Sequence, residues 1–255
     1  MPDSQPGTVL ITGAAKRVGR AIAEDLAARG FPVAIHYGGS EKEAAGLARD
    51  IEAKGGKAAA FQADLADSTA LSGLVEAAAA KLGPLTCLIN NASAFEDDTL
   101  ESLDEESWAL HLDTNLKAPA FLAKAFAAQL PEGAQGNIIN IIDQRVWRLT
   151  PRFFSYTLSK AGLWTMTQTL AQALAPRIRV NGIGPGPTLK NARQEEADFA
   201  RQQEALILRR GPDLGEITAA IRFILESPSL TGQMIALDGG QHLAWETPDV
   251  VGIPE

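Results

Sequence analysis

The sequence predicts an α/β fold: a single domain with a doubly wound, open parallel sheet of about seven strands and helices on both faces. Short apolar runs of strand length alternate along the whole chain with longer segments in which apolar residues recur at helical spacing. No long linker divides the chain, and no repeat of solenoid period is present. With 255 residues, 45% of them hydrophobic, the chain can bury one large core. We therefore expect residues 1–255 to form one domain.

The first half of the chain is expected to contain four strands and three helices. Val18, Ile22 and Leu26 recur every four residues, which predicts a first helix that ends at Gly30. Ser40 and Glu43 have the spacing of a capping box and begin the second helix. The other expected elements are strands at residues 9–11, 32–37, 57–62 and 85–90 and an alanine-rich helix at about 68–82.

The second half continues the same alternation. A long helix is expected at about residues 106–129, a strand at 137–142, a helix at about 155–175 and a strand at 178–183. A turn rich in glycine and proline leads into a polar segment, residues 190–204, before a last helix at about 215–225 and a last strand at 234–238. This order is that of a parallel sheet whose crossover connections are helices.

Charge and composition disfavour several classes of partner. The formal net charge of −8 disfavours nucleic acid and anionic membrane surfaces. No stretch approaches the ~20 apolar residues of a membrane-spanning helix, and the first eight residues lack the apolar core of a signal peptide, so we expect a cytoplasmic protein. Cys87 lies in an apolar run and is expected to be a buried small residue. No cysteine or histidine cluster has metal-ligand spacing, so no metal is expected.

A phosphate-binding turn is expected directly after the first strand. Residues 12–19 read Thr-Gly-Ala-Ala-Lys-Arg-Val-Gly and lead into the first helix. Small residues let the backbone approach a pyrophosphate, and the helix N-terminus favours its negative charge. The full G-x-G-x-x-G is not present, but the place of this turn in an α/β alternation is that of a dinucleotide site. The candidate contacts are Gly13, Lys16, Arg17, Val18 and Gly19.

The end of the second strand indicates which dinucleotide binds. In NAD-binding sheets an acidic residue there bonds the ribose 2′-hydroxyl, whereas this sequence has His36, Tyr37 and Gly38. Lys16 and Arg17 add positive charge nearby, and Ser40 begins a helix that could help to bind a 2′-phosphate. We therefore expect NADP(H). His36 is expected either to touch the adenine ribose or to be a hydrogen-bonded structural histidine.

Tyr156 and Lys160 form a candidate catalytic pair. They are four residues apart on a predicted helix and so share one face of it. A nearby ammonium is expected to favour the phenolate and to lower the pKa of Tyr156, which would make it a proton donor near neutral pH. The pair follows the fifth strand, downstream of a nucleotide-binding turn, and this position supports a catalytic role.

Taken together, these motifs resemble the short-chain dehydrogenases/reductases over essentially the whole chain. The matching residues are Thr12-Gly13 and Gly19, Asp64-Leu65, Asn90-Asn91-Ala92, Asn115, Tyr156 and Lys160, Pro185-Gly186, and Asp238-Gly239-Gly240. The resemblance implies a Rossmann fold with strand order 3-2-1-4-5-6-7, usually as a homotetramer. It also implies that Lys160 holds the nicotinamide ribose, that Asn115 organises a water chain to Lys160, and that Asp64 and Leu65 flank the adenine.

Two positions depart from the usual pattern of that family. Asp143 stands thirteen residues before the tyrosine, where the family usually has a serine. An ionised carboxylate cannot donate a hydrogen bond to a carbonyl oxygen, but it can accept from ring or amino N–H groups or relay a proton to a nitrogen. Asp143 therefore favours reduction of C=N in a heterocycle, unless it marks a lost serine or caps the next helix. Arg17 replaces the family's second glycine and is expected beside the pyrophosphate, within reach of substrate.

These departures resemble the pteridine reductases, a subgroup that includes bacterial dihydromonapterin reductases. The turn Thr12–Arg17 and the run Asn90-Asn91-Ala92-Ser93-Ala94-Phe95 carry this resemblance. It implies that Phe95 stacks on a flat pterin opposite the nicotinamide and that Ser93 bonds cofactor or substrate. From the residues alone, Phe95 could instead pack under a loop and Ser93 could bond its own backbone.

The leading expectation is NADPH-dependent reduction of a dihydropterin, a small-molecule substrate. The alternatives are a carbonyl reductase of the same family, acting on a ketone such as a 3-oxoacyl thioester, and a non-catalytic NADP(H)-sensing module. Segments 144–155 and 188–210 are the expected substrate rim, with Trp147 and Arg148 lining it or a subunit interface. The expected catalytic residues are Tyr156, Lys160, Asp143 and Asn115. The expected substrate contacts are Arg17, Ser93, Phe95, Asp143 and Tyr156. The expected cofactor contacts are Gly13, Lys16, Arg17, Val18, Gly19, His36, Tyr37, Ser40, Asp64, Leu65, Asn91, Ala92, Ser93, Tyr156, Lys160, Pro185, Gly186 and Thr188.

Overall fold

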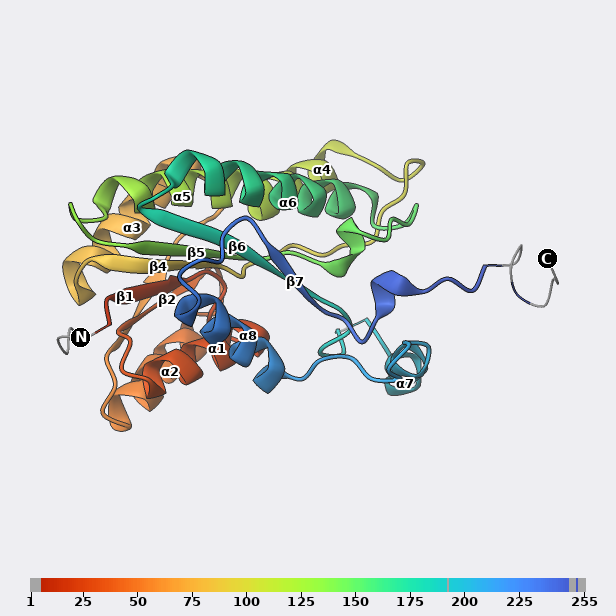
Figure 1. Cartoon of the computed structure of the whole chain (residues 1–255), viewed down its shortest axis with the longest axis horizontal. Helices are drawn as coiled ribbons and strands as arrows, with labels where there is room; N and C mark the ends of the chain where they lie inside the picture. The colour runs from red at the N-terminus through yellow and green to blue at the C-terminus, as the bar shows by residue number, and fades with distance from the viewer. Residues whose placement is uncertain (1–5, 192, 248–250, 252–255) are drawn as a thin grey trace.

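The sheet is the centre of the molecule (Figure 1). A computed structural model describes residues 6–191, 193–247 and 251, and its seven strands follow the order β3-β2-β1-β4-β5-β6-β7 with parallel pairing throughout. The strands are β1 (Thr8–Ile11), β2 (Val33–Tyr37), β3 (Ala58–Gln62), β4 (Leu85–Asn90), β5 (Gly136–Ile141), β6 (Ile178–Pro185) and β7 (Met234–Leu237). The predicted α/β class, with a doubly wound parallel sheet, is confirmed.

Helices cover both faces of the sheet (Figure 1). One layer contains α1 (Arg17–Ala28), α2 (Glu41–Ala53) and α8 (Leu214–Glu226), and the other contains α3 (Ser68–Leu82), α5 (Ala118–Gln129) and α6 (Phe154–Leu174). Successive residues of β1 divide between the layers: Val9 and Ile11 pack against the first, and Leu10 against the second. Both faces of the strands are therefore buried, as a parallel sheet requires. The remaining helices, α4 (Glu105–Leu112) and α7 (Glu196–Glu204), lie near the carboxyl end of the sheet.

The long helix expected at about residues 106–129 is interrupted. Asp113–Lys117 form a π-helical turn between α4 and α5. Pro119, in the first turn of α5, has no amide hydrogen and so could not make the backbone hydrogen bond that an unbroken helix needs there. The π-helical turn before it accommodates the missing bond. The turn places Asn115 inside the protein, with 1% of its surface exposed.

One local expectation in the polar segments needs correction. Helix α2 does begin after Ser40, but the Ser40 side chain makes no capping bond, and Glu43 pairs with Lys16 at 2.7 Å instead. The predicted capping box is therefore wrong at this helix, because an ion pair with the preceding turn takes the carboxylate. The polar segment 190–204 contains helix α7, whose buried surface is small.

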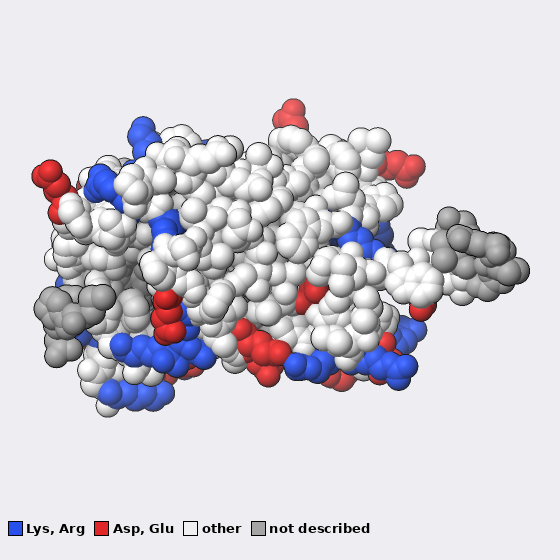
Figure 2. All heavy atoms as spheres, in the orientation of Figure 1, with Lys and Arg blue, Asp and Glu red and all other residues white. Residues whose placement is uncertain are grey.

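Charged side chains of both signs share the visible surface. Figure 2 shows lysine and arginine interspersed with aspartate and glutamate along the lower edge, while the centre of this face is uncharged. Several arginines pair with acids, including Arg20 with Glu24 and Asp50, and Arg222 with Asp25. The basic residues thus form no single patch on this face. Among the described residues, no helix is both long and apolar enough to span a membrane.

Cys87 is buried in β4 at 1% exposure, as expected, and burial raises the pKa of its thiol to about 12. A thiol that stays protonated at neutral pH is a poor nucleophile, so Cys87 is a packing residue.

The turn after β1 is packed too tightly for side chains at its glycines. Gly13 has a φ of +61°, and a Cβ there would lie 3.0 Å from the Cα of Ala92. A Cβ on Gly19 would lie 2.4 Å from the Gly13 carbonyl oxygen and 2.6 Å from the Asn91 amide nitrogen. The first turn of α1 therefore lies directly against the loop after β4.

Gly19→Ala should destabilise the protein by about 1–3 kcal/mol, because a methyl group forced into this contact must move backbone atoms. Gly73→Ala in α3 is the matched control, since nothing lies within 4 Å of a Cβ there, and alanine should stabilise that helix by about 0.5–1 kcal/mol. Urea unfolding of both variants measures the difference. Equal stability of the two variants would contradict the close packing at Gly19.

Candidate active site

Two adjoining cavities open at the carboxyl ends of the strands, where α/β sheets bind their ligands. The first, of about 860 Å³, contains most of the residues expected to contact a cofactor: Gly13, Lys16, Arg17, Val18, Gly19, His36, Asp64, Leu65, Asn91, Ala92, Ser93, Tyr156, Lys160, Pro185 and Gly186. The second, of about 670 Å³, is lined by both expected rim segments. The walls common to both include Arg17, Phe95, Asp143 and Tyr156. A group transferred from one cavity to the other would pass these residues.

Four expected site residues lie elsewhere. Thr188 lines the second cavity, while Tyr37, Ser40 and Asn115 line neither cavity. Tyr37 ends β2 and Ser40 precedes α2, so they lie on either side of Gly38, which does line the first cavity.

Thr12 and Asn91 fix the phosphate-binding turn to the loop after β4. The Thr12 hydroxyl accepts hydrogen bonds from the backbone amides of Asn91 and Ala92, both at 3.0 Å. The Asn91 side chain donates in return to the carbonyls of Thr12 and Gly13, at 2.8 and 3.2 Å. Both loops are thereby held at the mouth of the first cavity.

His36 has a structural role in the same turn. Its Nδ1 accepts a hydrogen bond from the Gly13 amide at 3.1 Å, so Nε2 carries the proton and donates to the Ala63 carbonyl at 3.2 Å. Burial lowers the pKa of His36, which keeps the ring neutral and this tautomer in place. His36 is thus a hydrogen-bonded histidine that also lines the first cavity, and its contact with the adenine ribose stays a prediction.

Arg17 has a backbone conformation that favours glycine. Its φ is +54°, in the left-handed region that L residues rarely adopt. Its guanidinium donates to the carbonyls of Leu189 and Lys190, at 3.1 and 2.9 Å. Arg17 thus joins the turn after β1 to the rim segment after β6, and its side chain borders both cavities.

The central polar group is the pair formed by Tyr156 and Asp143. The Tyr156 hydroxyl donates to Asp143 Oδ2 at 2.8 Å, and Asp143 Oδ1 accepts from the Arg145 amide at the same distance. Asp143 therefore caps the short 3₁₀ helix Gln144–Val146 and holds the tyrosine at once. Lys160, 2% exposed, donates to the Ile141 carbonyl at 2.9 Å.

The expectation that Lys160 lowers the pKa of Tyr156 is wrong for this structure. Burial and the adjacent Asp143 carboxylate raise the pKa of Tyr156 well above its ordinary value. Burial also lowers the pKa of Lys160, to about 8, which weakens the lysine as a source of positive charge. Tyr156 consequently stays protonated at neutral pH and is available as a proton donor.

Asn115 holds the loop after β4 against α6. Its Oδ1 accepts from the Ala94 amide at 2.8 Å, and its Nδ2 donates to the Ala94 carbonyl and the Ser159 hydroxyl, both at 3.0 Å. These bonds occupy the side-chain amide, so Asn115 positions the residue next to Phe95.

A second buried chain fixes the same loop. The Glu96 amide donates to His111 Nε2 at 2.9 Å, and His111 Nδ1 then donates to the Ser155 hydroxyl at 2.7 Å. Ser155 in turn donates to the buried carboxylate of Asp98. Hydrogen bonds therefore join the loop that carries Phe95 to the first turn of α6, which carries Tyr156.

Phe95 lies in an aromatic cluster at the substrate side. Its ring stacks on Phe153 with centroids 4.6 Å apart and an interplanar angle of 4°, and it meets Tyr156 edge-on at 4.7 Å. The guanidinium carbon of Arg145 lies 4.6 Å from the Phe153 centroid. The ring of Phe95 thus lines both cavities while it is packed against Phe153.

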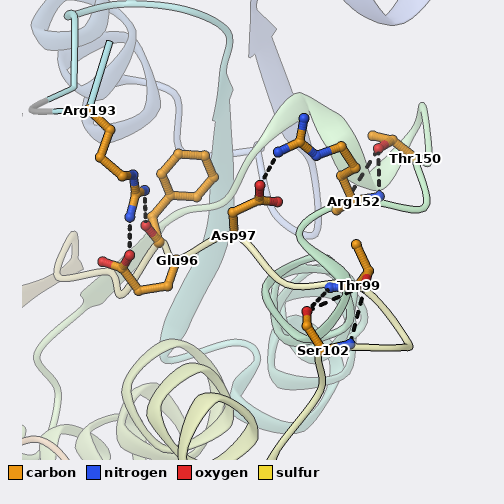
Figure 3. A network of polar contacts seen from close by, with 8 residues as sticks. Glu96, Asp97, Thr99, Ser102, Thr150, Arg152 and Arg193 are labelled. Atoms are coloured by element: carbon orange, nitrogen blue, oxygen red, sulfur yellow. Dashed lines mark hydrogen bonds and ion pairs between the residues drawn. The ribbon is translucent and has the colours of Figure 1, made fainter.

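Two ion pairs join the loop after β4 to both rim segments (Figure 3). Arg193 contacts Glu96 and the Phe95 carbonyl, and Arg152 contacts Asp97. The sequence analysis missed Arg145, Arg152, Phe153 and Arg193 as individual residues, although all four lie within the expected rim segments. Trp147 instead packs on Trp164 and His242, and Arg148 donates to the Gln241 carbonyl.

Comparison with known proteins identifies the family. The family model described as short chain dehydrogenase matches residues 7–200. The chain belongs to this family. A crystal structure of FolM alternative dihydrofolate reductase 1 from Brucella suis with NADP is 53% identical, with a TM-score of 0.94, over 97% of this chain and 99% of that one. A blue fluorescent protein from a metagenomic library, with NADPH, is 31% identical, with a TM-score of 0.86, over 92% and 98%.

Another relative of the chain is named for a different reaction. The 3-oxoacyl-[acyl-carrier-protein] reductase FabG of Staphylococcus epidermidis is 30% identical over 241 residues, covering 92% of this chain and 99% of the relative. The comparisons confirm the prediction of an NADP-dependent oxidoreductase.

Replacing Asp143 by asparagine should lower the pKa of Tyr156, because the carboxylate that opposes the phenolate is removed while burial remains. The chain has two tyrosines, so in a Tyr37→Phe background the tyrosinate absorbance reports Tyr156 alone. The titration should shift to lower pH in Asp143→Asn. An identical titration with and without the carboxylate would show that Asp143 does not control this hydroxyl.

Proposed function

We propose that this protein is an NADPH-dependent reductase of a pteridine, which converts a dihydropterin to a tetrahydropterin by reducing a C=N bond. The observation that carries the proposal is the hydrogen bond between Tyr156 and Asp143 at the wall shared by the two cavities. The similarity to a protein named alternative dihydrofolate reductase supports the same class of substrate.

The first cavity suits NADP(H). Gly13 and Gly19 line this cavity at the N-terminus of α1, which would favour the negative charge of a pyrophosphate. Gly38 follows β2 and has no acidic side chain, which at this place would repel a 2′-phosphate. Lys16 and Ser40 are close to it. Lys160 would hold the nicotinamide ribose, and Asp64 and Leu65 would flank the adenine. When bound, NADPH supplies a hydride.

Tyr156 and Asp143 would supply the proton that the reaction also needs. A carboxylate at this place repels a carbonyl oxygen but accepts from the N–H groups of a heterocycle. Once the ring carbon has gained a hydride, the neighbouring nitrogen gains a proton, which passes from Tyr156 through the Asp143 carboxylate. The raised pKa of Tyr156 keeps its hydroxyl protonated before transfer, and the phenolate left after transfer would regain a proton from solvent before the next turnover.

Phe95 would stack on the flat substrate, and Arg17 and Ser93 would contact its edge. Segments 144–155 and 188–210 would form the rim of this site, where Arg152 and Arg193 already join the loop that carries Phe95. By family resemblance, we further propose that the protein is a homotetramer in the cytoplasm.

Reduction of a carbonyl is the second candidate, because a relative that is 30% identical is named a 3-oxoacyl-[acyl-carrier-protein] reductase. Asp143 disfavours this reaction, since an ionised carboxylate offers no hydrogen to a carbonyl oxygen.

Comparing substrates in the wild type and in Asp143→Ser tests the proposal. The wild type should oxidise NADPH rapidly with dihydrobiopterin or dihydromonapterin and slowly with a 3-oxoacyl thioester. Asp143→Ser should lower kcat/KM for the pterin about 100-fold, as expected for loss of a positioned proton relay, without a matching loss on the thioester.

Asp97→Ser is the matched control, because it also removes a carboxylate from the lining of the second cavity. The Asp97 carboxylate pairs with Arg152 and not with Tyr156. It should leave the ratio of the two activities unchanged. Rapid thioester turnover with no pterin turnover in the wild type would contradict the proposal.

A further inference from the structure

Arg145 stands at the substrate side of the cavity wall, and the proposed mechanism does not use it. It lies in the short helix Gln144–Val146, two residues after Asp143, and lines the second cavity together with Phe95 and Tyr156. Its positive charge also acts on the reacting group, because it partly offsets the rise in the pKa of Tyr156. Arg145 is therefore close enough to influence the chemistry at Tyr156.

The other arginines of this cavity already have oxygen partners. Arg17 donates to two backbone carbonyls, Arg152 pairs with Asp97, and Arg193 pairs with Glu96. Arg145 differs: its Nη1 is buried and has no hydrogen-bond partner among residues 6–191, 193–247 and 251. An unpaired buried donor carries a free-energy cost that an arriving acceptor would remove.

The guanidinium is held in place without using its hydrogen-bond donors. Its carbon lies 4.6 Å from the Phe153 centroid, 5.7 Å from that of Phe95 and 6.0 Å from that of Tyr156. The Arg145 amide donates to the Asp143 carboxylate at 2.8 Å, which fixes the origin of the side chain relative to that acceptor. One donor and one acceptor are thus presented from the same short segment.

We propose that Arg145 is a substrate-recognition residue that donates a hydrogen bond to the ring carbonyl oxygen of the substrate while Asp143 accepts from a ring or amino N–H. This inference rests on the proposed function, since an oxo-pteridine presents both groups on one planar ring. A planar guanidinium matches an oxygen acceptor in the plane of such a ring. The pair would select heterocycles that carry an oxo group over those that carry an amino group at the same position.

The test compares wild type, Arg145→Met and Arg145→Lys on two dihydropteridines. One carries the ring oxo group, and the other carries an amino group in its place. Arg145→Met should raise KM for the oxo substrate about tenfold or more, as expected for loss of a charged hydrogen bond. Its kcat should fall by a smaller factor than the rise in KM, because Tyr156 and Asp143 remain and only the distant positive charge beside Tyr156 is lost. KM for the amino analogue should not rise, and Arg145→Lys should recover part of the loss on the oxo substrate.

Arg148→Met is the matched control, because Arg148 belongs to the same segment but donates to the Gln241 carbonyl and does not line the cavity. It should behave as wild type on both substrates. NADPH affinity, followed by fluorescence, verifies that each variant is folded. If Arg145→Met folds poorly, Arg145→Lys decides instead, and the inference predicts that its KM rises for the oxo substrate but not for the amino analogue.

Two results would overturn the inference. In the first, the wild type reduces the oxo-pterin, but Arg145→Met has the wild-type KM or an equal rise in KM for both substrates. Arg145 then does not recognise the ring oxygen, and the proposed function stands. If the wild type reduces no pterin at all, the proposed function and the inference both fail.

Discussion

The hydrogen bond from Tyr156 to Asp143 joins the carboxyl end of β5 to the first turn of α6, and the geometry of the site depends on it. The same carboxylate caps the short helix that carries Arg145. Buried chains through Asn115 and through His111 fix the loop of Phe95 to α6 as well. Hydrogen bonds therefore join Tyr156, Asp143 and the loop of Phe95 in one unit, and the proposed function would use this unit as a preorganised site.

Burial, rather than spacing, decides the acid–base behaviour of this unit. The four-residue separation of Tyr156 and Lys160 correctly places both on one helix face, but it carries no information about desolvation. With the carboxylate of Asp143 at 2.8 Å and both side chains buried, the tyrosine holds its proton and the lysine releases its own more readily. In the proposed reaction, a tyrosine that is protonated at neutral pH could still hold its proton when the ring nitrogen needs it.

Periodicity predicted the strands of the sheet, and a short motif at a strand end predicted the turn that borders the first cavity. The strand order and several other residues of that cavity were expected only from the family resemblance. Other features depend on contacts between distant segments. Glu43 pairs with Lys16 and does not cap its own helix. The hydrogen bonds of His36 join residues that follow β1 and β3, which are far apart in the sequence. Arg145 and Phe153 belonged to a segment expected at the rim, but no motif distinguishes them from Trp147 or Arg148, which face elsewhere.

The destination of the hydride tests the central claim most directly. A dihydropterin with a ketone in its side chain offers a ring C=N and a C=O in one molecule, and NADPH deuterated at the transferred position marks the atom that is reduced. The account predicts deuterium at the ring carbon of the C=N bond in the isolated product, located by NMR. Deuterium at the side-chain carbinol carbon, with the ring unreduced, would contradict it and would identify the protein as a carbonyl reductase.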